Sequence, residues 1–404
     1  MKELKDFENE IYKCSRCGLC QSVCPVYKAT LNECAVSRGK FNILNGIVKK
    51  ELNLTKQVKK HLDLCTGCNA CKDFCPSQIN AKEIFITAKA EYHKKHKPTS
   101  WERLINSYTL FKTLLICGKV FFLVYRCLLL DKLVNPTAKL IANKCTLGKR
   151  VLLLNTLATK TKTKTKSTKS TTIKNKTAIY FEGCFNQYLN SETKDAVENI
   201  LANSDIKVIN KNFECCGVSY LNDGNIKEYK KLINKNLEKL NCQYNYLITD
   251  CASCNEILKN YRIYSSNEPA KELSKKVVSV IDIIKELKFK ANTNLKVSIH
   301  KPCHEDTDFR DLVKNIKNIN FVDVEEYNKC CGFSGKFALQ NSEISRKISQ
   351  NKAQKYIDCD TDIILTTCPA CQLGLNQGLA ETNCNKKTMV MNLFVFLNTY
   401  CEQI

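Results

Sequence analysis

The chain is 404 residues long, 44% hydrophobic and 25% charged, which allows two or three domains and is typical of a soluble globular protein. Its 26 cysteines do not indicate a secreted disulfide scaffold, because the chain is long and its N-terminus has mixed charges and no apolar run. The formal net charge of +23 favours nucleic acid, but lysine is frequent throughout and cysteine-bound clusters would offset the charge. We therefore expect a cytoplasmic metal-binding protein with no nucleic-acid partner.

Residues 1–100 contain two cysteine runs with the same spacing. Each reads C-x-x-C-x-x-C-x-x-x-C-P, the pattern of bacterial ferredoxins, in which three cysteines hold one [4Fe–4S] cluster and the fourth ligates the other. The expected ligands of the first [4Fe–4S] cluster are Cys14, Cys17, Cys20 and Cys75. The expected ligands of the second [4Fe–4S] cluster are Cys65, Cys68, Cys71 and Cys24. Structural zinc is the alternative, but it usually takes paired C-x-x-C groups.

The residues around these runs have helical periodicity. Apolar side chains recur at helical spacing in residues 41–48 and again in residues 84–92. The two runs are also further apart than a compact ferredoxin with a short connection would place them. We therefore predict a mostly α-helical domain over residues 1–100 that carries electrons and does not catalyse a reaction.

We expect an apolar helical connector over residues 101–158 and a Lys/Thr-rich linker over residues 159–177. The stretch 110–130 is almost long enough to cross a bilayer, but it contains basic residues that would cost roughly 2.5–3.5 kcal/mol each at the centre of a bilayer. Three interpretations remain: a buried helix between domains, a basic amphipathic segment on a membrane surface or a membrane-bound partner, and a transmembrane span. The linker lacks core-forming side chains and is expected to be solvated.

Short runs of β-forming residues alternate with helical patterns after the linker, which favours parallel α/β sheets. The expected strands are residues 177–182, 206–209, 246–249, 297–300, 321–324 and 363–366. Apolar stripes at helical spacing lie between several of them, as in residues 226–240 and 344–357.

The cysteines of this region form a repeat. A single cysteine, a Cys-Cys-Gly triplet and a C-x-x-C pair occur in that order twice, with equivalent cysteines 119, 115 and 117 residues apart. We therefore expect two modules, residues 178–290 and residues 291–404. Each cysteine group follows an expected strand, and loops at the carboxyl ends of parallel strands are where open α/β sheets bind ligands.

Each module is thus expected to gather five thiols at one sheet edge. The first set is Cys184, Cys215, Cys216, Cys251 and Cys254. The second set is Cys303, Cys330, Cys331, Cys368 and Cys371. Iron–sulfur clusters are the preferred hypothesis because five thiols exceed the four ligands of tetrahedral zinc, and zinc or free redox thiols are the alternatives. Gly217 and Gly332 would let the backbone turn closely against a cofactor.

His300 and His304 are candidates for a supporting or proton-handling role, or plain loop residues.

The repeated Cys-Cys-Gly modules resemble the cysteine-rich CCG domain of heterodisulfide reductase subunits. With the double ferredoxin run, the chain resembles the D subunit of heterodisulfide reductase, the C subunit of the anaerobic glycerol-3-phosphate dehydrogenase and the glycolate oxidase iron–sulfur subunit. It is most similar to the last of these around the ferredoxin runs and after them. The similar strings are Ser37–Lys40, His61–Cys65, Cys75–Ser77 and Trp101–Leu104.

The resemblance implies an α+β multidomain fold, with a helical double [4Fe–4S] ferredoxin domain followed by two α/β CCG modules that hold one or two further iron–sulfur clusters. It implies the electron-transfer subunit of a glycolate or D-lactate dehydrogenase, which takes electrons from a partner FAD subunit toward the quinone pool. The partner would oxidise the substrate, and this chain has no G-x-G-x-x-G motif for a flavin of its own. A peripheral position on the inner face of the cytoplasmic membrane would fit that role.

Two features depart from the glycolate oxidase pattern. Both five-cysteine sets are complete, which favours a thiol–disulfide oxidoreductase similar to heterodisulfide reductase, and the glycerol-3-phosphate dehydrogenase subunit is a further alternative. Lys301 stands where the family often has aspartate, so a carboxylate at that position is absent.

Overall fold

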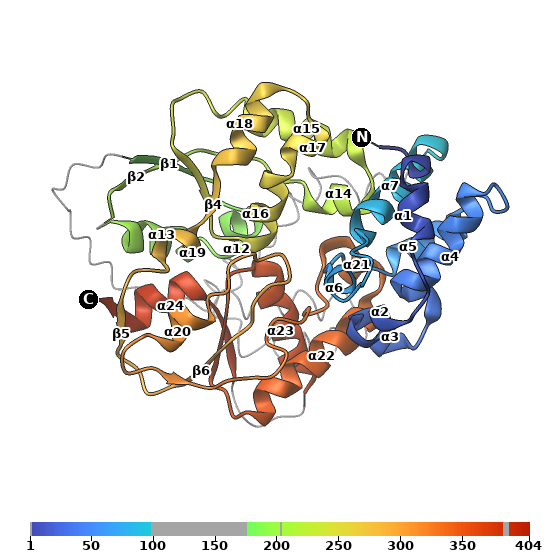
Figure 1. Cartoon of the computed structure of the whole chain (residues 1–404). Helices are drawn as coiled ribbons and strands as arrows, with labels where there is room; N and C mark the ends of the chain where they lie inside the picture. Colours follow the sequence, from blue (N-terminus) through green and yellow to red (C-terminus); the bar gives the residue numbers. More distant parts are fainter. Residues whose placement is uncertain (1, 98–175, 203, 383–387) are drawn as a thin grey trace, which may run out of the picture.

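The structure, a computed structural model, describes residues 2–97, 176–202, 204–382 and 388–404. Figure 1 shows a helical N-terminal region on one side of a larger region that contains the sheets. The expected connector, residues 101–158, and nearly all of the expected linker, residues 159–177, lie outside the described residues. The expected fold class, a helical domain followed by two repeated α/β modules, is confirmed.

The N-terminal region consists of short helices around one apolar core. Cys24 caps α3, where its sulfur accepts a hydrogen bond from the Tyr27 backbone N–H and a proline occupies the first turn. Phe41 of α4 and Phe85 of α7 pack within the core, with their ring centroids 5.4 Å apart. The helices are η1 (Leu4–Phe7), α1 (Glu8–Tyr12), α2 (Leu19–Val23), α3 (Pro25–Thr30), η2 (Glu33–Ala35), α4 (Ser37–Val48), α5 (Lys56–Asp63), α6 (Ala70–Asp73) and α7 (Ala81–Lys95).

The first α/β module is built on a parallel sheet of order β2-β1-β3-β4. Its strands are β1 (Lys176–Tyr180), β2 (Ile206–Asn210), β3 (Tyr246–Thr249) and β4 (Val277–Ser279). Its helices are α12 (Cys184–Leu189), α13 (Glu192–Leu201), α14 (Val218–Asp223), α15 (Ile226–Leu237), α16 (Ala252–Lys259), α17 (Tyr261–Tyr264), α18 (Glu268–Lys276) and α19 (Val280–Ile284). The sequence does not predict β4, because it is a short strand directly between two helices.

The second module repeats this topology, with a parallel sheet of order β7-β6-β8-β9. Its strands are β6 (Lys296–Ile299), β7 (Asn320–Phe321), β8 (Ile363–Thr366) and β9 (Met389–Asn392). Its helices are α20 (Arg310–Lys314), α21 (Gly335–Gln340), α22 (Ser342–Asp358), α23 (Pro369–Glu381) and α24 (Leu393–Tyr400). The edge strand β7 is shorter than the expected strand 321–324, and β9 is not predicted.

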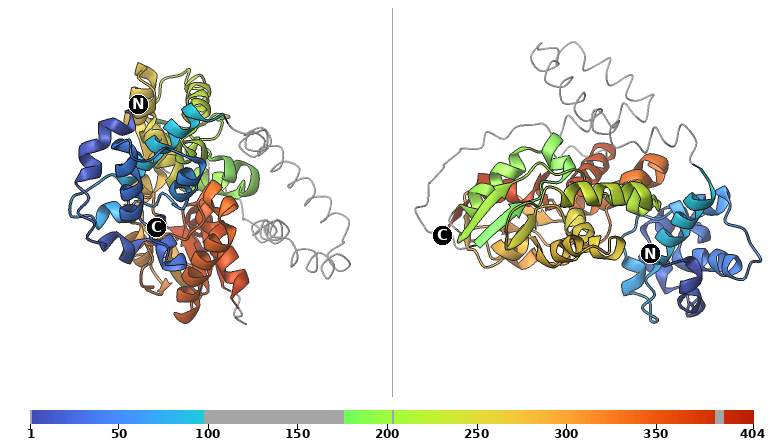
Figure 2. Two further views of the ribbon diagram at one scale, coloured as in Figure 1. Left: turned by 90° about the vertical axis from the view of Figure 1, so that its right-hand side faces the viewer. Right: turned by 90° about the horizontal axis from the view of Figure 1, so that it is seen from above.

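The two modules share one apolar core. Helix α13 packs against α24, and Tyr180 and Val297 from the two sheets lie in the same buried cluster as Phe394. The antiparallel pair of β5 (Phe289–Ala291) and β10 (Cys401–Gln403) joins the segment between the modules to the residues after α24. The two modules therefore form a single packed unit, and Figure 2 shows the N-terminal helices at one end of it.

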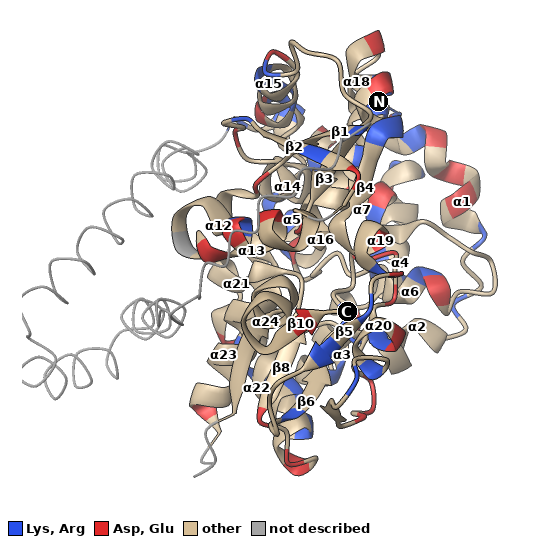
Figure 3. Cartoon of the chain, turned by 90° about the vertical axis from the view of Figure 1, so that its left-hand side faces the viewer, with Lys and Arg blue, Asp and Glu red and all other residues tan. Residues whose placement is uncertain are grey.

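Charged residues of both signs are interspersed on the described surface, as Figure 3 shows for the side that faces the viewer. Arg310 and Lys314 both pair with Asp323, and Lys276 pairs with Glu272. Among the helices that the structure describes, none has both the length and the apolar character needed to cross a membrane.

Candidate metal centres

The eight ferredoxin cysteines lie close together in the helical domain, and Cys71 borders both predicted groups. One small cavity is lined by Cys14, Cys17, Cys20 and Cys75, and also by Cys71. The thiols that lie near one another in the second group are those of Cys24, Cys65, Cys68 and Cys71. Burial raises the pKa of Cys24 to about 11 and that of Cys71 to about 12, because the thiolate form is poorly solvated there. A cationic cluster core would stabilise such thiolates, so the sulfur sets fit [4Fe–4S] clusters, while each ligand assignment stays a prediction.

A buried lysine, which sequence reasoning missed as a functional residue, lies beside the second ferredoxin group. The Lys40 side chain is 1% exposed and donates hydrogen bonds to the backbone carbonyls of Ala35 and Leu64, the latter at 3.0 Å. Burial lowers the pKa of Lys40, and the negative charges of Cys65 and Cys24 act in the opposite direction. The only signal in the sequence is the string Ser37–Lys40. The ammonium group of Lys40 lies where its positive charge can offset the negative charge of a cluster.

The first module places its five cysteines around the carboxyl ends of its strands. Cys184 begins α12 after β1, and Cys251 is the N-cap of α16 after β3. The Cys184 and Cys215 sulfurs are 3.6 Å apart. Two buried side chains fix the backbone of the Cys215–Cys216 loop by hydrogen bonds. Asn236 donates to the Cys215 carbonyl at 3.1 Å, and Tyr261 donates to the Cys216 carbonyl at 3.1 Å.

The second module arranges its five cysteines in the same way. Cys368 is the N-cap of α23 after β8, and Cys303 follows β6. Helix α22 fixes the Cys-Cys loop, because Ser349 donates to the Cys331 carbonyl at 2.8 Å and Ser345 donates to the Gly332 carbonyl at 3.0 Å. The structure therefore brings together all five predicted cysteines of each module.

The glycine of each Cys-Cys-Gly triplet has a left-handed backbone and a specific packing role. The φ angle is +90° at Gly217 and +80° at Gly332, and each N–H donates to the sulfur of the cysteine two residues earlier at 3.4 Å. A Cβ at Gly217 would lie 2.6 Å from Tyr229, and one at Gly332 would lie 2.7 Å from Ile348. The two glycines thus pack closely against α15 and α22, and each supplies an N–H···S hydrogen bond, while the expected close approach to a cofactor stays a prediction.

The crowding of the thiols supports a metal centre in each module. Hydrogen bonding with neighbouring thiols raises the pKa of Cys184 in the first set and of Cys303 in the second well above the ordinary value. In each set another sulfur accepts such hydrogen bonds, and its pKa is lowered: Cys215 in the first and Cys331 in the second. Five adjacent thiols, most of them buried, fit an iron–sulfur centre, because its iron ions compensate several adjacent thiolates.

Contacts between thiols also connect the groups to one another. The Cys68 thiol of the second ferredoxin group contacts Cys330 of the second module. The Cys368 thiol of the second module contacts Cys251 of the first and lies 3.7 Å from the Ser253 hydroxyl. The second ferredoxin group, the second module and the first module therefore form an uninterrupted line of cysteine sets.

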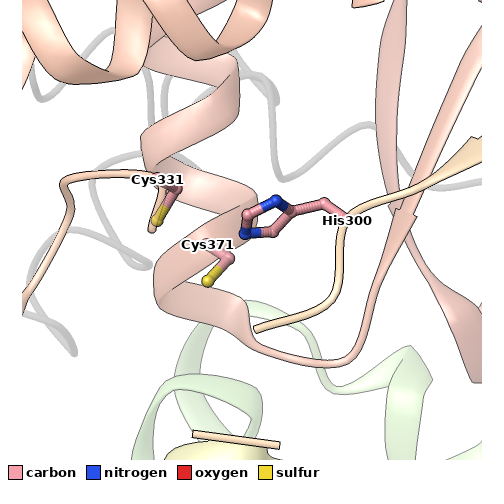
Figure 4. A group of neighbouring side chains, drawn as sticks. All are labelled: His300, Cys331 and Cys371. Atoms are coloured by element: carbon pink, nitrogen blue, oxygen red, sulfur yellow. The ribbon is translucent and has the colours of Figure 1, made fainter. Parts of the chain in front are cut away.

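The two candidate histidines occupy different environments. His300 follows β6, is fully buried, and lies with Cys331 and Cys371 in a group whose donor atoms are all within 4.8 Å of one another, as Figure 4 shows. Burial lowers the pKa of His300 well below its ordinary value, so the ring is neutral. His304 instead pairs with Glu256 through Nδ1 and Oε2 at 2.5 Å.

A cavity of about 430 Å³ lies at the junction of the ferredoxin domain and the second module and is lined by residues of both. Its lining includes the thiols of Cys68, Cys303 and Cys330. It is also lined by the lysines Lys28, Lys301, Lys329, Lys352 and Lys355. Burial lowers the pKa of Lys352 to about 7. Asp73 and Glu326 line the same cavity, and Glu326 pairs with Lys28 and Lys355. The cavity therefore gives a small molecule access to the cysteines of the second module beside charged groups of both signs.

Comparison with known proteins confirms the resemblance that the sequence indicates. Residues 10–79 match the 4Fe-4S dicluster domain, and residues 178–259 and 297–376 each match the cysteine-rich domain. The chain is 24% identical to the probable glycolate oxidase iron–sulfur subunit of Bacillus subtilis, over 97% of the chain and 94% of that protein.

Two further relatives carry names that indicate different functions. The D subunit of the dihydromethanophenazine:CoB–CoM heterodisulfide reductase of Methanosarcina acetivorans is 22% identical over 91% of the chain and 89% of that protein. Lactate utilization protein A of Oceanobacillus iheyensis is 26% identical over 46% of the chain and 82% of that protein. The matches to the dicluster and cysteine-rich domains show that iron–sulfur clusters are the cofactors.

Proposed function

We propose that this chain, which belongs to the iron–sulfur proteins that join a 4Fe-4S dicluster domain to two cysteine-rich domains, passes electrons from an FAD-containing 2-hydroxy-acid dehydrogenase subunit toward the quinone pool. Its relatives include iron–sulfur subunits of larger oxidoreductases, which implies a partner subunit. Iron–sulfur clusters accept and release single electrons when bound. The substrate of the partner would be glycolate or D-lactate.

The observation that carries this proposal is the line of contacting cysteine sets. Cys68 and Cys330 join the ferredoxin domain to the second module, and Cys368 and Cys251 join the second module to the first. Because neighbouring sets share side-chain contacts, adjacent centres would be close enough for fast electron transfer. This arrangement suits a protein that conducts electrons between a partner at one end and an acceptor at the other.

The test is anaerobic reduction of the purified chain, mixed with its flavin-containing partner, by glycolate, D-lactate or glycerol 3-phosphate, with EPR as the readout. We expect a 2-hydroxy acid to reduce the clusters and glycerol 3-phosphate to leave them oxidised. The variant Cys330→Ser should interrupt the line, so that clusters on only one side of it are reduced. The matched control is Cys242→Ser, because Cys242 is exposed and belongs to no set. If no 2-hydroxy acid reduces any cluster, the proposal fails.

A second candidate, thiol–disulfide reduction, is favoured by the lysine-lined cavity beside Cys303 and Cys330. A small disulfide could reach these thiols from the cavity. Two-electron reduction of such a disulfide by the chain, supplied with electrons by a chemical reductant and without any flavoprotein, would replace the first proposal by this one if the activity is lost in Cys331→Ser with the ferredoxin clusters intact.

Iron and sulfide analysis separates the two candidates at an earlier stage. About eight irons per chain with only reduced cubane signals would correspond to the two ferredoxin clusters alone, would confine electron transfer to the ferredoxin domain and would exclude cluster-based disulfide chemistry in the modules. A larger iron content, with an additional EPR signal that responds to added thiol, would favour disulfide chemistry at the Cys-Cys pairs.

A further inference from the structure

We propose that His300 is a nitrogen ligand of the iron–sulfur centre in the second module, so that this centre has a mixed sulfur and nitrogen donor set. The ring nitrogens of His300 and the sulfurs of Cys331 and Cys371 form the one group of this kind among the described residues, with all donor atoms within 4.8 Å. All three side chains are buried, and Figure 4 shows the imidazole beside the two cysteines.

The imidazole of His300 has unsatisfied hydrogen-bonding capacity. Its exposed fraction is 0%, and neither Nδ1 nor Nε2 has a hydrogen-bond partner in the part of the chain that the structure describes. The Tyr327 carbonyl lies near the ring and also accepts a hydrogen bond from the Lys301 backbone N–H at 3.1 Å, so it can serve as an acceptor for one ring nitrogen and leaves the other without a partner. Buried polar groups without partners are rare in folded proteins, because they lose their hydrogen bonds to water. A metal ion beside the ring would satisfy one nitrogen and leave the other free to donate to a carbonyl.

The repeat supplies an internal comparison, because the position equivalent to His300 in the first module is Phe181. The Phe181 N–H donates to the Ile248 carbonyl of β3 at 2.8 Å, and the His300 N–H donates to the Leu365 carbonyl of β8 at 2.7 Å. Both side chains have an exposed fraction of 0%. An apolar ring therefore fills this place in the first module, and packing alone does not require an imidazole in the second.

A nitrogen ligand would make the two modules electronically different. Imidazole is a neutral donor and thiolate is an anionic one, and replacing cysteine by histidine raises the reduction potential of an iron–sulfur cluster. The centre of the second module would therefore hold an electron more strongly than a centre with sulfur ligands alone. This inference rests on the presence of a cluster in the second module and is independent of the substrate that the partner oxidises.

The experiment is pulsed EPR of the full chain labelled with ¹⁵N-histidine, together with iron analysis and a redox titration. We expect a ¹⁵N coupling on the second-module centre of the wild type, its loss in His300→Phe, and its retention in His304→Gln. Because a phenyl ring occupies the same place in the first module, His300→Phe should fold. His300→Cys, which restores a ligand, should keep the iron, lose the coupling and shift the midpoint potential downward.

Two outcomes would overturn the inference. One is a paramagnetic second-module centre with no histidine coupling in the wild type, or with a coupling that persists in His300→Phe. The other is an unchanged iron content after Cys303→Ser, Cys330→Ser and Cys368→Ser combined, which would show that the module holds no centre. Neither outcome depends on whether the flavin partner reduces the ferredoxin clusters, so the proposed function is tested separately.

Discussion

A single buried ammonium group influences the electrostatics of the ferredoxin domain. Lys40 lies within reach of the negative charges of Cys24, Cys65 and Cys71, and its two carbonyl partners fix it there. A positive charge at such a distance favours the reduced, more negative state of a cluster. The residue thus acts on the reduction potential without being a ligand.

We predict that Lys40→Met lowers the reduction potential of the second ferredoxin cluster. For a unit charge a few ångströms away at an effective dielectric constant of about 20, the decrease is on the order of 100 mV. The measurement is an EPR-monitored redox titration, with the exposed Lys60 changed to methionine as the control. Equal potentials in Lys40→Met and Lys60→Met, with both clusters intact, would contradict the role of Lys40.

At this scale the sequence shows which cysteines form sets, names His300 only as one of two candidate histidines and does not show Lys40. The spacing of the cysteines is dictated by the cluster that they surround, so it is readable in the chain. Lys40 and His300 carry no such spacing, because their partners come from distant segments such as Leu64 and Cys371. Only the fold brings those segments together.

The turns after the cysteine pairs operate as small structural elements. In each, a glycine in the left-handed region directs its N–H toward a sulfur, and the same glycine allows the turn to pack against the second helix after it, α15 or α22. The geometry of the Cys-Cys pair and the position of helix α15 or α22 are therefore set by one residue.

We predict that Gly332→Ala destabilises the second module and reduces its iron content. The left-handed backbone would cost about 1–2 kcal/mol with a Cβ, and overpacking against Ile348 a further 1–3 kcal/mol. Thermal denaturation and iron analysis measure the effect.

The control variant for this prediction is Gly67→Ala. Gly67 also has a positive φ, +72°, but among the described residues a Cβ there would meet nothing closer than 3.8 Å, so this variant should show the backbone strain alone. Similar losses of stability in the two variants would show that the contact with Ile348 is unimportant.

The elements themselves are predictable where the pattern is long enough. Strands β3 and β8 coincide with the expected residues 246–249 and 363–366, because each is an apolar run bounded by turns. The fourth strands, β4 and β9, are missed. Each is directly followed by a helix, so its few residues merge with the helical pattern.

Two carboxylates of the first module connect all three domains. Asp223 binds Lys59 and His93 of the ferredoxin domain and Lys336 of the second module. Burial alone would raise the pKa of Asp223, but these partners outweigh it and lower the pKa far below its ordinary value.

Glu256 is the second of these carboxylates, and it binds Lys82 of the ferredoxin domain and His304 of the second module. Burial acts to raise its pKa as well, but His304 and then Lys82 lower it to about 2. Both carboxylates are therefore charged at neutral pH, and the ion pairs that join the domains are present at that pH.

We predict that Asp223→Asn lowers the free energy of unfolding by about 3–5 kcal/mol, because it leaves buried cations without their counter-charge. The measurement is urea denaturation at neutral pH, combined with hydrogen exchange in α7 and α21, which should increase. The control is Asp306→Asn, since the Lys259–Asp306 pair is largely exposed and should contribute at most about 1 kcal/mol. A loss no larger than that of the control would show that the junction does not hold the domains together.

The docking of the domains is beyond sequence reasoning. Asp223, Lys59 and Lys336 belong to different regions of the chain and form no motif, and single charged residues at such positions are usually solvated. The cysteine runs and the repeat predict a ferredoxin domain and two modules, but not the junctions at which they meet.

The core that the two modules share has a consequence for how the protein is made. Tyr180 of β1 lies in the same buried cluster as Phe394 of α24, and α13 of the first module packs against α24. During synthesis on the ribosome, the first module therefore exposes an apolar face until α24 has emerged from the exit tunnel. Its five cysteines are complete long before that moment. The nascent chain must keep these thiols reduced, and the apolar face unaggregated, through the synthesis of the whole second module.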